Sequence, residues 1–339
     1  MKRVVVDAFG GDNAPVDIIA GCAMALSEIS DLYLILTGDE ERIEQELKKH
    51  TGIDRNRVEV RHAPDVITNN EHPVNAVRRK KESSLVKALE AVANKDADVF
   101  VSAGSTGAVL AGATFIVRRI KGIKRPALAP VLPTKKDHDV ILIDCGANVD
   151  MKPANLQQFA VMGAAYAERI MGIKNPRVGL LNNGAEAEKG CELTKEAYKL
   201  LQETPVNFTG NCEGRDILSG DFDVVVSDGF AGNVALKTIE GTAMMVMSVM
   251  KRELMGGIAS RIGALLARGA FKRIKAKMDY SSHGGALLLG IDGGIIKAHG
   301  SSDAKAFAAA LHQAVKFIDG DVVNIIRQSI ESMAMPEES

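Results

Sequence analysis

Glycines and small polar residues are concentrated directly after four short apolar runs of the sequence. They form four groups: Asp7, Gly10, Gly11 and Asp12; Ser102, Gly104, Ser105, Thr106 and Gly107; Asp144, Gly146 and Asn148; and Asp228, Gly229 and Gly232. Glycine lets backbone N–H groups approach an anion, and the N-terminus of a following helix adds a partial positive charge. Any one group could simply make a turn, but four groups that converge favour a phosphate-binding site.

Four further side chains could act on a substrate beside bound phosphate. Asn233 and Lys237 are spaced i, i+4 behind a glycine turn, so they share one face in the first turns of a helix. Lys189 offers a second cation, and His283 offers an acid–base group. Each has a plain alternative, namely a solvated lysine or a histidine that only hydrogen-bonds within its loop. The hypothesis is that these four residues are catalytic.

Standard cofactor and catalytic fingerprints are missing from the sequence. There is no GxGxxG, no GxxxxGK[ST] and no HExxH motif, so no dinucleotide, P-loop or zinc-protease site is predicted. The stretch AGSTG (103–107) differs from GxSxG in its first residue, which makes Ser105 a weak candidate for a nucleophile. The four cysteines lie far apart with no CxxC pair, which argues against a zinc site or a disulfide framework. We expect no metal and no cofactor.

The elements that hold these groups follow from a repeated pattern, in which a short apolar run leads into a turn and often into a helical period. We predict eight strands from these runs: Arg3–Val6, Leu32–Leu36, Val58–Val60, Val99–Val101, Val140–Ile143, Val178–Leu181, Val206–Phe208 and Val224–Val226. Continuous apolar strands that alternate with helices are typical of a mostly parallel sheet covered on both faces. The sequence therefore predicts a three-layer α/β/α sandwich in which residues 1–339 form one domain, with ligands beyond the carboxyl ends of the strands.

One segment, at about residues 243–278, departs from this pattern and is predicted to be a helical excursion from the sandwich. Between Lys251 and Lys277 it carries eight basic residues and one acidic residue. A basic amphipathic helix can lie on an anionic bilayer or attract an acidic partner protein. The alternative is that these helices pack a dimer and leave a solvated basic rim. Nine residues are predicted to contact the membrane or an acidic partner, which the resemblance described below identifies as a carrier protein: Leu254, Ile258, Arg261, Ile262, Leu265, Leu266, Arg268, Lys272 and Arg273.

The composition argues against several other functions. The formal net charge is −1, tryptophan is absent and aromatic residues make up 4% of the chain, so nucleic-acid binding is not expected. No run approaches the roughly 18 apolar residues of a membrane span. The apolar run at the N-terminus meets Asp7 too early for a signal peptide. We expect a cytoplasmic protein whose contact with a membrane is peripheral.

Seven stretches carry a recognisable pattern in a fixed order from Val6 to about Ser302. They are VDAFGGDNAP (6–15), EHPVNAVRRKKESSLVKAL (71–89), ADVFVSAGSTGAVLA (97–111), DCGANVDMKPANLQQFAVMGAAYA (144–167), RVGLLNNGAEAEKGCELTKEAY (177–198), NFTGNCEGRDILSGDFDVVVSDGFAGNVALKTIEG (207–241) and YSSHGGALLLG (280–290). Together they resemble the phosphate acyltransferase family of bacterial phospholipid synthesis. Ser105 stands where many members of that family have asparagine.

This resemblance implies transfer of a long-chain acyl group from acyl carrier protein to inorganic phosphate. It also implies a homodimer, a membrane glycerol-phosphate acyltransferase that takes the product, and a fold related to phosphotransacetylases and to isocitrate and isopropylmalate dehydrogenases. Three alternatives remain open at this point. They are a phosphotransacetylase-like enzyme acting on acyl-CoA, a metal- and NAD-dependent dehydrogenase, and a non-catalytic scaffold that brings the carrier protein to the membrane.

Acyl transfer from a thioester needs no covalent enzyme intermediate. A phosphate oxygen attacks the carbonyl carbon, a tetrahedral oxyanion forms, and a thiolate whose thiol has a pKa near about 8.5 leaves. The enzyme must orient the phosphate and stabilise the oxyanion. We predict that Lys237, Asn233 and the 104–107 loop bind phosphate, with Lys189 or His283 near the carbonyl or the sulfur.

Overall fold

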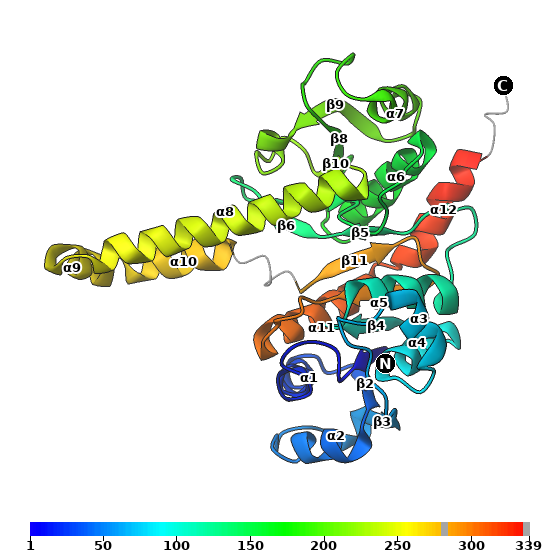
Figure 1. Cartoon of the computed structure of the whole chain (residues 1–339), viewed down its shortest axis with the longest axis vertical. Coiled ribbons are helices and arrows are strands. Elements are labelled where there is room, and N and C mark those ends of the chain that lie inside the picture. Colours follow the sequence, from blue (N-terminus) through cyan, green and yellow to red (C-terminus); the bar gives the residue numbers. More distant parts are fainter. Residues whose placement is uncertain (279–283, 335–339) are drawn as a thin grey trace.

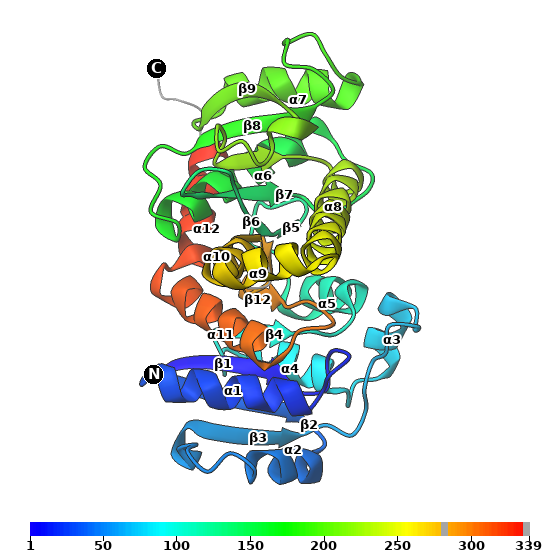
Figure 2. The same ribbon diagram turned by 90° about the vertical axis from the view of Figure 1, so that its left-hand side faces the viewer.

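The computed structural model of the chain describes residues 1–278 and 284–334, whose strands form two sheets (Figures 1 and 2). Within these residues, one sheet has seven strands in the order β3-β2-β1-β4-β12-β11-β5, and the other has five in the order β6-β7-β10-β8-β9. The strands are β1 (Lys2–Asp7), β2 (Leu32–Gly38), β3 (Val58–His62), β4 (Val99–Ser102), β5 (Ala127–Ala129), β6 (Val131–Pro133), β7 (Asp139–Ile143), β8 (Arg177–Asn182), β9 (Asn207–Glu213), β10 (Val224–Val226), β11 (Ala286–Leu289) and β12 (Gly294–Lys297).

Helices cover both faces of the sheets. They are α1 (Val16–Glu28), α2 (Glu40–Leu47), α3 (Pro73–Arg79), α4 (Ser84–Ala93), α5 (Thr106–Gly112), α6 (Pro153–Arg169), α7 (Glu192–Gln202), α8 (Gly229–Met255), α9 (Ile258–Leu266), α10 (Arg268–Met278), α11 (Ala304–Asp319) and α12 (Val322–Ala334). The α/β fold with mostly parallel strands is therefore confirmed, and all eight predicted strands are present.

The strands divide into two sheets rather than the single predicted sheet. The short strands β5 and β6 follow each other with only Pro130 between them, and each pairs antiparallel with a different partner, β11 and β7 respectively. Proline has no backbone N–H to donate to a ladder, so it is suited to the point where the chain leaves one sheet for the other. The carboxyl ends of both parallel sets thus lie close to this crossing.

Alternation along the buried strands explains the layers. In β1, Val4 and Val6 belong to the same apolar cluster as Ile19 of α1 and Phe307 of α11, whereas Val5 belongs to the cluster formed with α4. Successive side chains of a strand point to opposite faces, so a run of three valines supplies both layers. All three valines are fully buried. In the five-stranded sheet, α6 and α8 pack on opposite faces in the same way.

The helix that leads into the predicted excursion begins before residue 243. We call α8, α9 and α10 the helical arm; α8 starts at Gly229, and beyond its first turns the arm projects away from the two sheets (Figure 1). Asp228 fixes this start because its carboxylate accepts hydrogen bonds from the N–H groups of Phe230 and Ala231, both at 2.9 Å. The first turns of α8 therefore belong to the body of the protein. Among the described residues, no helix combines the length and hydropathy needed to cross a bilayer.

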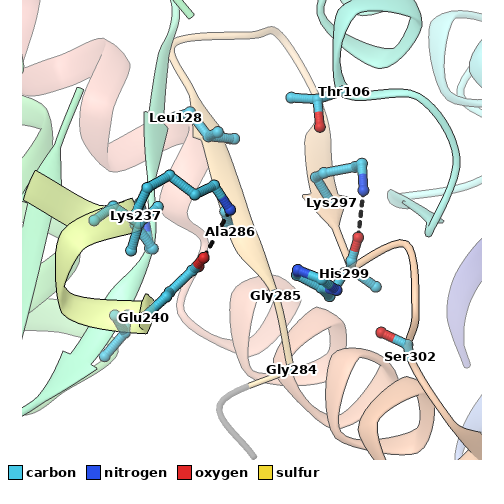
Figure 3. A pocket seen from close by; sticks show the side chains of 14 residues that line it. Thr106, Leu128, Lys237, Glu240, Gly284, Gly285, Ala286, Lys297, His299 and Ser302 are labelled. Atoms are coloured by element: carbon cyan, nitrogen blue, oxygen red, sulfur yellow. Dashed lines mark hydrogen bonds and ion pairs between the residues drawn. The ribbon is translucent and has the colours of Figure 1, made fainter. Parts of the chain in front are cut away.

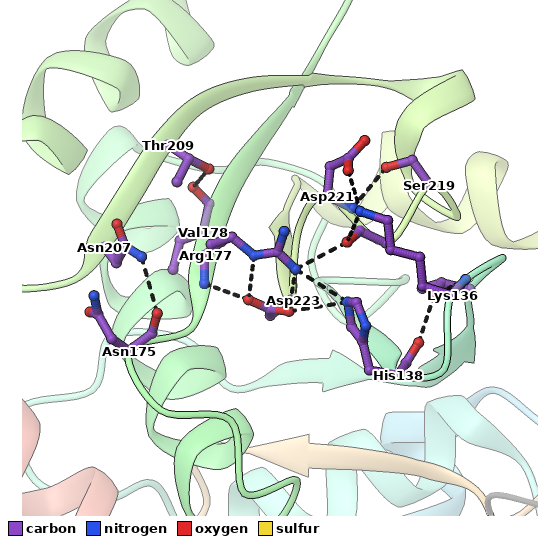
Figure 4. A network of polar contacts seen from close by, with 12 residues as sticks. Lys136, His138, Asn175, Arg177, Val178, Asn207, Thr209, Ser219, Asp221 and Asp223 are labelled. Carbon is purple, nitrogen blue, oxygen red and sulfur yellow. Dashed lines mark hydrogen bonds and ion pairs between the residues drawn. The ribbon is translucent and has the colours of Figure 1, made fainter.

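An ionic network ties the amino-terminal ends of β8 and β10 together (Figure 4). The Arg177 guanidinium donates to both carboxylate oxygens of Asp223, at 3.0 and 2.9 Å, and His138 lies 3.4 Å from the same carboxylate. Burial acts to raise the pKa of Asp223, but the hydrogen bonds from Arg177 outweigh it and the pKa is lowered. This network joins the strands at their amino-terminal ends, opposite to the ends that lead into the glycine-rich turns.

Candidate active site

Three polar residues stand in a row at the carboxyl edge of the seven-stranded sheet. The register pairs Val6 with Val101 and Lys297 with Ser102, so Asp7, Ser102 and Lys297 end three adjacent parallel strands. The Ser102 hydroxyl donates to the Asp7 carboxylate at 2.7 Å and accepts the Gly104 N–H at 2.9 Å. Burial raises the pKa of the Asp7 carboxyl, although hydrogen bonds from Ser84 and Ser102 act in the opposite direction.

The glycines of the first two groups allow these two turns to touch. A Cβ atom on Gly10 would lie 2.5 Å from the Asp7 carboxylate and 2.8 Å from the Gly104 nitrogen. Gly11 has a φ of +109°, and the Asp12 N–H donates to the Gly300 carbonyl at 2.8 Å. The turns after β1, β4 and β12 therefore form one packed unit.

A second unit lies at the carboxyl edge of the five-stranded sheet around Asp144. Its carboxylate accepts hydrogen bonds from the N–H groups of Leu128, Ala147 and Asn148 and from the Asn148 amide, at distances of 2.8–3.0 Å. The Asn148 amide also donates to the Pro126 carbonyl at 2.7 Å. Burial raises the pKa of Asp144 despite these contacts. Asp144 and Asn148 thus hold the turn after β7 in place.

The start of α8 packs directly onto this second unit. A Cβ atom on Gly229 would lie 2.1 Å from the Asn148 carbonyl oxygen, and one on Gly232 would lie 1.9 Å from the Asp144 carbonyl oxygen. Asn233 lies over Gly146, whose added Cβ would be 3.6 Å from the asparagine side chain. The four predicted turns are therefore brought together as two pairs, one at each sheet.

A pocket lies between the two units, and we call it the central pocket (Figure 3). It has a cavity volume of about 120 Å³. Figure 3 shows Lys237 reaching it from α8 on one side, and Lys297 and His299 on the other. The pocket is lined by Thr106, Leu128, Pro130, Val131, Leu236, Lys237, Glu240, Gly284, Gly285, Ala286, Lys297, Ala298, His299 and Ser302.

Lys297 is a buried cation in the wall of the central pocket, only 9% exposed. Its ammonium group contacts the Ala298 and Ala103 carbonyl oxygens, at 2.5 and 3.4 Å. Among the described residues no carboxylate forms an ion pair with it, although Asp12 and Asp7 act on its charge from nearby. Burial is the largest effect and lowers the pKa of Lys297 to about 8. A buried lysine without an ion-pair partner is unusual in a folded protein and is suited to receive an anion.

Lys237 is the second cation of the central pocket. Its ammonium group lies 2.7 Å from the Glu240 carboxylate, and the two side chains are 57% and 9% exposed respectively. Because Glu240 is buried and Lys237 is not, the pair holds the lysine head at the mouth of the pocket. The positive charge of Lys237 also lowers the pKa of Lys297, because the two cations repel each other.

The other predicted residues take varied places. Thr106, the first residue of α5, lines the central pocket. Its neighbours Ser105, at the N-cap, and Gly107, in the first turn of α5, are not among the lining residues. Lys189 is exposed in the loop after β8, where its carbonyl accepts a hydrogen bond from the Asn182 amide. His283 lies outside the described residues. The catalytic and ligand-binding roles of all these residues remain predictions.

Several pocket residues were missed from the sequence. Lys297, His299 and Ser302 follow the apolar pair Ile295–Ile296, and a small-residue turn after an apolar run is the same signal that marked the other strand ends. Glu240 gave no signal, because a glutamate in a helix is normally solvated. Nδ1 of His299 accepts a hydrogen bond from the Ser301 N–H at 3.3 Å and lies 2.9 Å from the Ser301 hydroxyl. Within residues 1–278 and 284–334, no cluster of three or more His, Cys, Asp or Glu could hold a metal ion.

Comparison with known proteins gives consistent matches over the whole chain. The profile of a family described as "Fatty acid synthesis protein" matches residues 2–325. The phosphate acyltransferase of Clostridium novyi (strain NT) is 51% identical over 329 residues, which are 97% of this chain and 98% of that protein.

Two solved structures are similar in fold alone. The EutD phosphotransacetylase from Staphylococcus aureus has a TM-score of 0.57 at 18% identity and covers 97% of this chain and 94% of its own. The 4-hydroxythreonine-4-phosphate dehydrogenase from Klebsiella pneumoniae has a TM-score of 0.52 at 12% identity, with coverages of 93% and 98%. The predicted similarity of the fold to phosphotransacetylases is confirmed, and the fold also resembles that of a dehydrogenase, whereas the relation to isocitrate and isopropylmalate dehydrogenases stays a prediction.

Proposed function

This chain belongs to the phosphate acyltransferase family, and we propose that its central pocket transfers a long-chain acyl group from the thioester of acyl carrier protein to inorganic phosphate. Membership makes it an acyltransferase that acts in fatty acid and phospholipid synthesis. The carrier-protein donor, the long acyl chain and the passage of the acyl phosphate to a membrane glycerol-phosphate acyltransferase are the further parts of the proposal.

The observation that carries this proposal is the buried Lys297, which has no ion-pair partner among the described residues and faces Lys237 across the central pocket. A phosphate anion between the two ammonium groups would give Lys297 an ionic partner, share Lys237 with Glu240, and relieve the cost of burying Lys297. The pair of cations from two different sheets therefore supports phosphate as the second substrate.

The proposed reaction uses groups that the chain already holds in place. Lys297 and Lys237 orient the phosphate, and one of its oxygens attacks the thioester carbonyl carbon. The carbonyl π electrons move to oxygen, and the oxyanion collapses to expel the carrier's thiolate. The Thr106 hydroxyl and the imidazole of His299 are donors in the pocket wall that can stabilise the oxyanion or protonate the thiolate. Asn233 supports the phosphate side from α8, and Lys189 and His283 remain candidates for the carbonyl side.

The proposal predicts a defined stoichiometry. Palmitoyl-acyl carrier protein should release its free thiol only when phosphate is added, and hydroxylamine should trap an equal amount of acyl hydroxamate. Palmitoyl-CoA assayed beside it separates this function from a phosphotransacetylase-like activity. Release of thiol without phosphate would mean that water accepts the acyl group, which would contradict the proposal. No release from folded protein would favour the scaffold alternative.

We also propose that the helical arm makes the contacts with the carrier protein and with an anionic membrane, in a cytoplasmic homodimer. Its apolar side chains are strongly exposed: Ile258 by 79%, Leu265 by 69% and Leu266 by 85%. Arg268, Lys272 and Arg273 lie on the same arm. Exposed apolar residues interleaved with cations suit a surface where apolar tails lie beneath anionic head groups.

A further inference from the structure

A second, apolar pocket lies beside the central pocket, and we call it the side pocket. It has a cavity volume of about 400 Å³, within the range of pockets that bury small molecules. It is formed by β6 and the residues after it, by Ile239, Glu240 and Ala243 of α8, by Leu218 and by the end of α10. Its lining residues are Leu132, Pro133, Thr134, Lys135, Leu218, Ile239, Glu240, Ala243 and Lys277.

The side pocket continues the central pocket along two elements. Pro130, which precedes β6, and Val131, its first residue, line the central pocket, and the next residues, Leu132 and Pro133, line the side pocket. On α8, Leu236 and Lys237 line the central pocket, and Ile239 and Ala243, one to two turns further along the helix, line the side pocket. Glu240 lines both pockets. The two pockets therefore adjoin at Glu240.

Apart from the exposed Lys135, the polar side chains of the side pocket are already engaged. The Thr134 hydroxyl donates to the His138 carbonyl at 2.6 Å, and the Lys277 ammonium donates to the Lys136 carbonyl at 3.0 Å and lies 3.5 Å from Asp137. Glu240 is paired with Lys237 at 2.7 Å. What remains for recognition is the surface of Leu132, Leu218, Ile239 and Ala243, which is hydrocarbon. Leu132 belongs to the buried cluster under α8, and Leu218 and Ile239 pack against that cluster.

We propose that the side pocket holds the acyl chain of the substrate and that Ala243 sets how long a chain it accepts. This inference rests on the proposed function, because an acyl group joined to the reacting carbonyl must leave the central pocket in some direction. The side pocket adjoins the central pocket, and apart from the exposed Lys135 its unengaged lining is apolar. Ala243 lies four residues after Ile239 on the same face of α8, so a larger side chain there would project into the pocket.

The test replaces Ala243→Leu and compares it with Thr242→Leu, which places the same side chain at the exposed neighbouring position. Phosphate-dependent turnover is measured with thioesters of 4, 8, 12 and 16 carbons. We expect kcat/KM of the wild type to rise with chain length. Ala243→Leu should lower it at least tenfold for the longest donors and leave the 4-carbon donor within about twofold, since filling a site removes only the contacts of methylenes that reach it. Thr242→Leu should keep the wild-type profile.

A binding measurement separates this inference from the proposed reaction. Alkyl phosphates of the same lengths carry the chain and the anion but cannot transfer an acyl group. Their affinity should rise with length in the wild type and level off earlier in Ala243→Leu. Leu218→Ala, which enlarges the opposite wall, should extend the rise to longer chains. Identical length profiles in all three proteins would overturn the assignment of the side pocket, even if turnover is normal. A length profile altered by Ala243→Leu in an enzyme that turns over no thioester would support the side pocket and reject the reaction.

Discussion

Lys297 and Lys237 line one pocket from two different sheets. Lys297 ends β12 of the seven-stranded sheet, and Lys237 lies in the helix that follows β10 of the five-stranded sheet. Neither sheet alone places two cations at the pocket. The crossing of the chain at Pro130 brings the two carboxyl edges together, and the site depends on that crossing.

Replacing Lys297→Met should remove the buried cation while keeping most of the side-chain volume. We expect kcat/KM for phosphate to fall about 10²–10³-fold, the usual effect of losing one preorganised charged donor. Steady-state rates at varied phosphate concentrations measure this change, and circular dichroism checks that the fold is intact. A folded Lys297→Met protein with a wild-type phosphate dependence would contradict the role of this lysine.

The pH dependence of phosphate use should report on Lys297. A lysine is cationic below its pKa, and burial lowers this pKa to about 8, so the charge is lost as the pH rises from about 7 to 9. We therefore expect kcat/KM for phosphate, which reflects the free enzyme, to fall across that interval. Lys297→Arg keeps its charge throughout and should show a flatter profile, whatever its absolute rate. The same fall in both proteins would mean that another group titrates.

Lys237→Ala should weaken phosphate binding by a factor of ten or more, seen as a raised KM or a lowered kcat. The side chain is 57% exposed, so we expect a smaller loss than at Lys297, and one that decreases with added salt. Lys251→Ala is the matched control, because Lys251 is an exposed lysine on the same helix and does not line the central pocket. Equal kinetics for the two variants would exclude Lys237 from the site.

The sequence was sufficient to predict the parallel strands and the turns that follow them. Runs such as Val4–Val6 and Val224–Val226 are buried on both faces, so their signal does not depend on distant contacts. The turns were recognised because glycine is needed where two backbone segments of the chain touch, as at Gly10 and Gly232. Which turns pair with which was not predictable, since the pairing follows from the strand order of each sheet.

The residues that were missed depend on short strands and on tertiary packing. β12 contains only Ile295 and Ile296 between a glycine and Lys297, so neither the strand nor its terminal lysine was recognised. Glu240 is buried because α8 packs over the five-stranded sheet beside β6, and no local pattern reveals that contact. The early start of α8 was missed because the Met- and Ala-rich composition is strongest after residue 243.

The helical arm should lose membrane contact when its apolar surface is broken. Leu265→Glu places a carboxylate on a side chain that is 69% exposed, and we expect flotation with vesicles containing anionic lipid to decrease strongly. Val16→Glu makes the same kind of change at a residue of similar exposure, 53%, far from the arm in sequence, and should have no effect. Unchanged flotation of Leu265→Glu would reject the membrane role and leave the carrier protein as the partner of the arm.

Two glycines of α8 should respond in opposite ways to the same substitution. A Cβ atom at Gly232 would lie 1.9 Å from the Asp144 carbonyl oxygen, so Gly232→Ala forces α8 away from the turn after β7. We expect the free energy of unfolding to fall by about 1–3 kcal/mol, as for other overpacked sites. Gly241 has no atom within 4 Å of the added Cβ, so Gly241→Ala should stabilise the helix by up to about 1 kcal/mol. Denaturant unfolding of both variants measures the difference. A stable Gly232→Ala protein with unaltered phosphate kinetics would show that the contact between α8 and Asp144 is not needed to position Lys237.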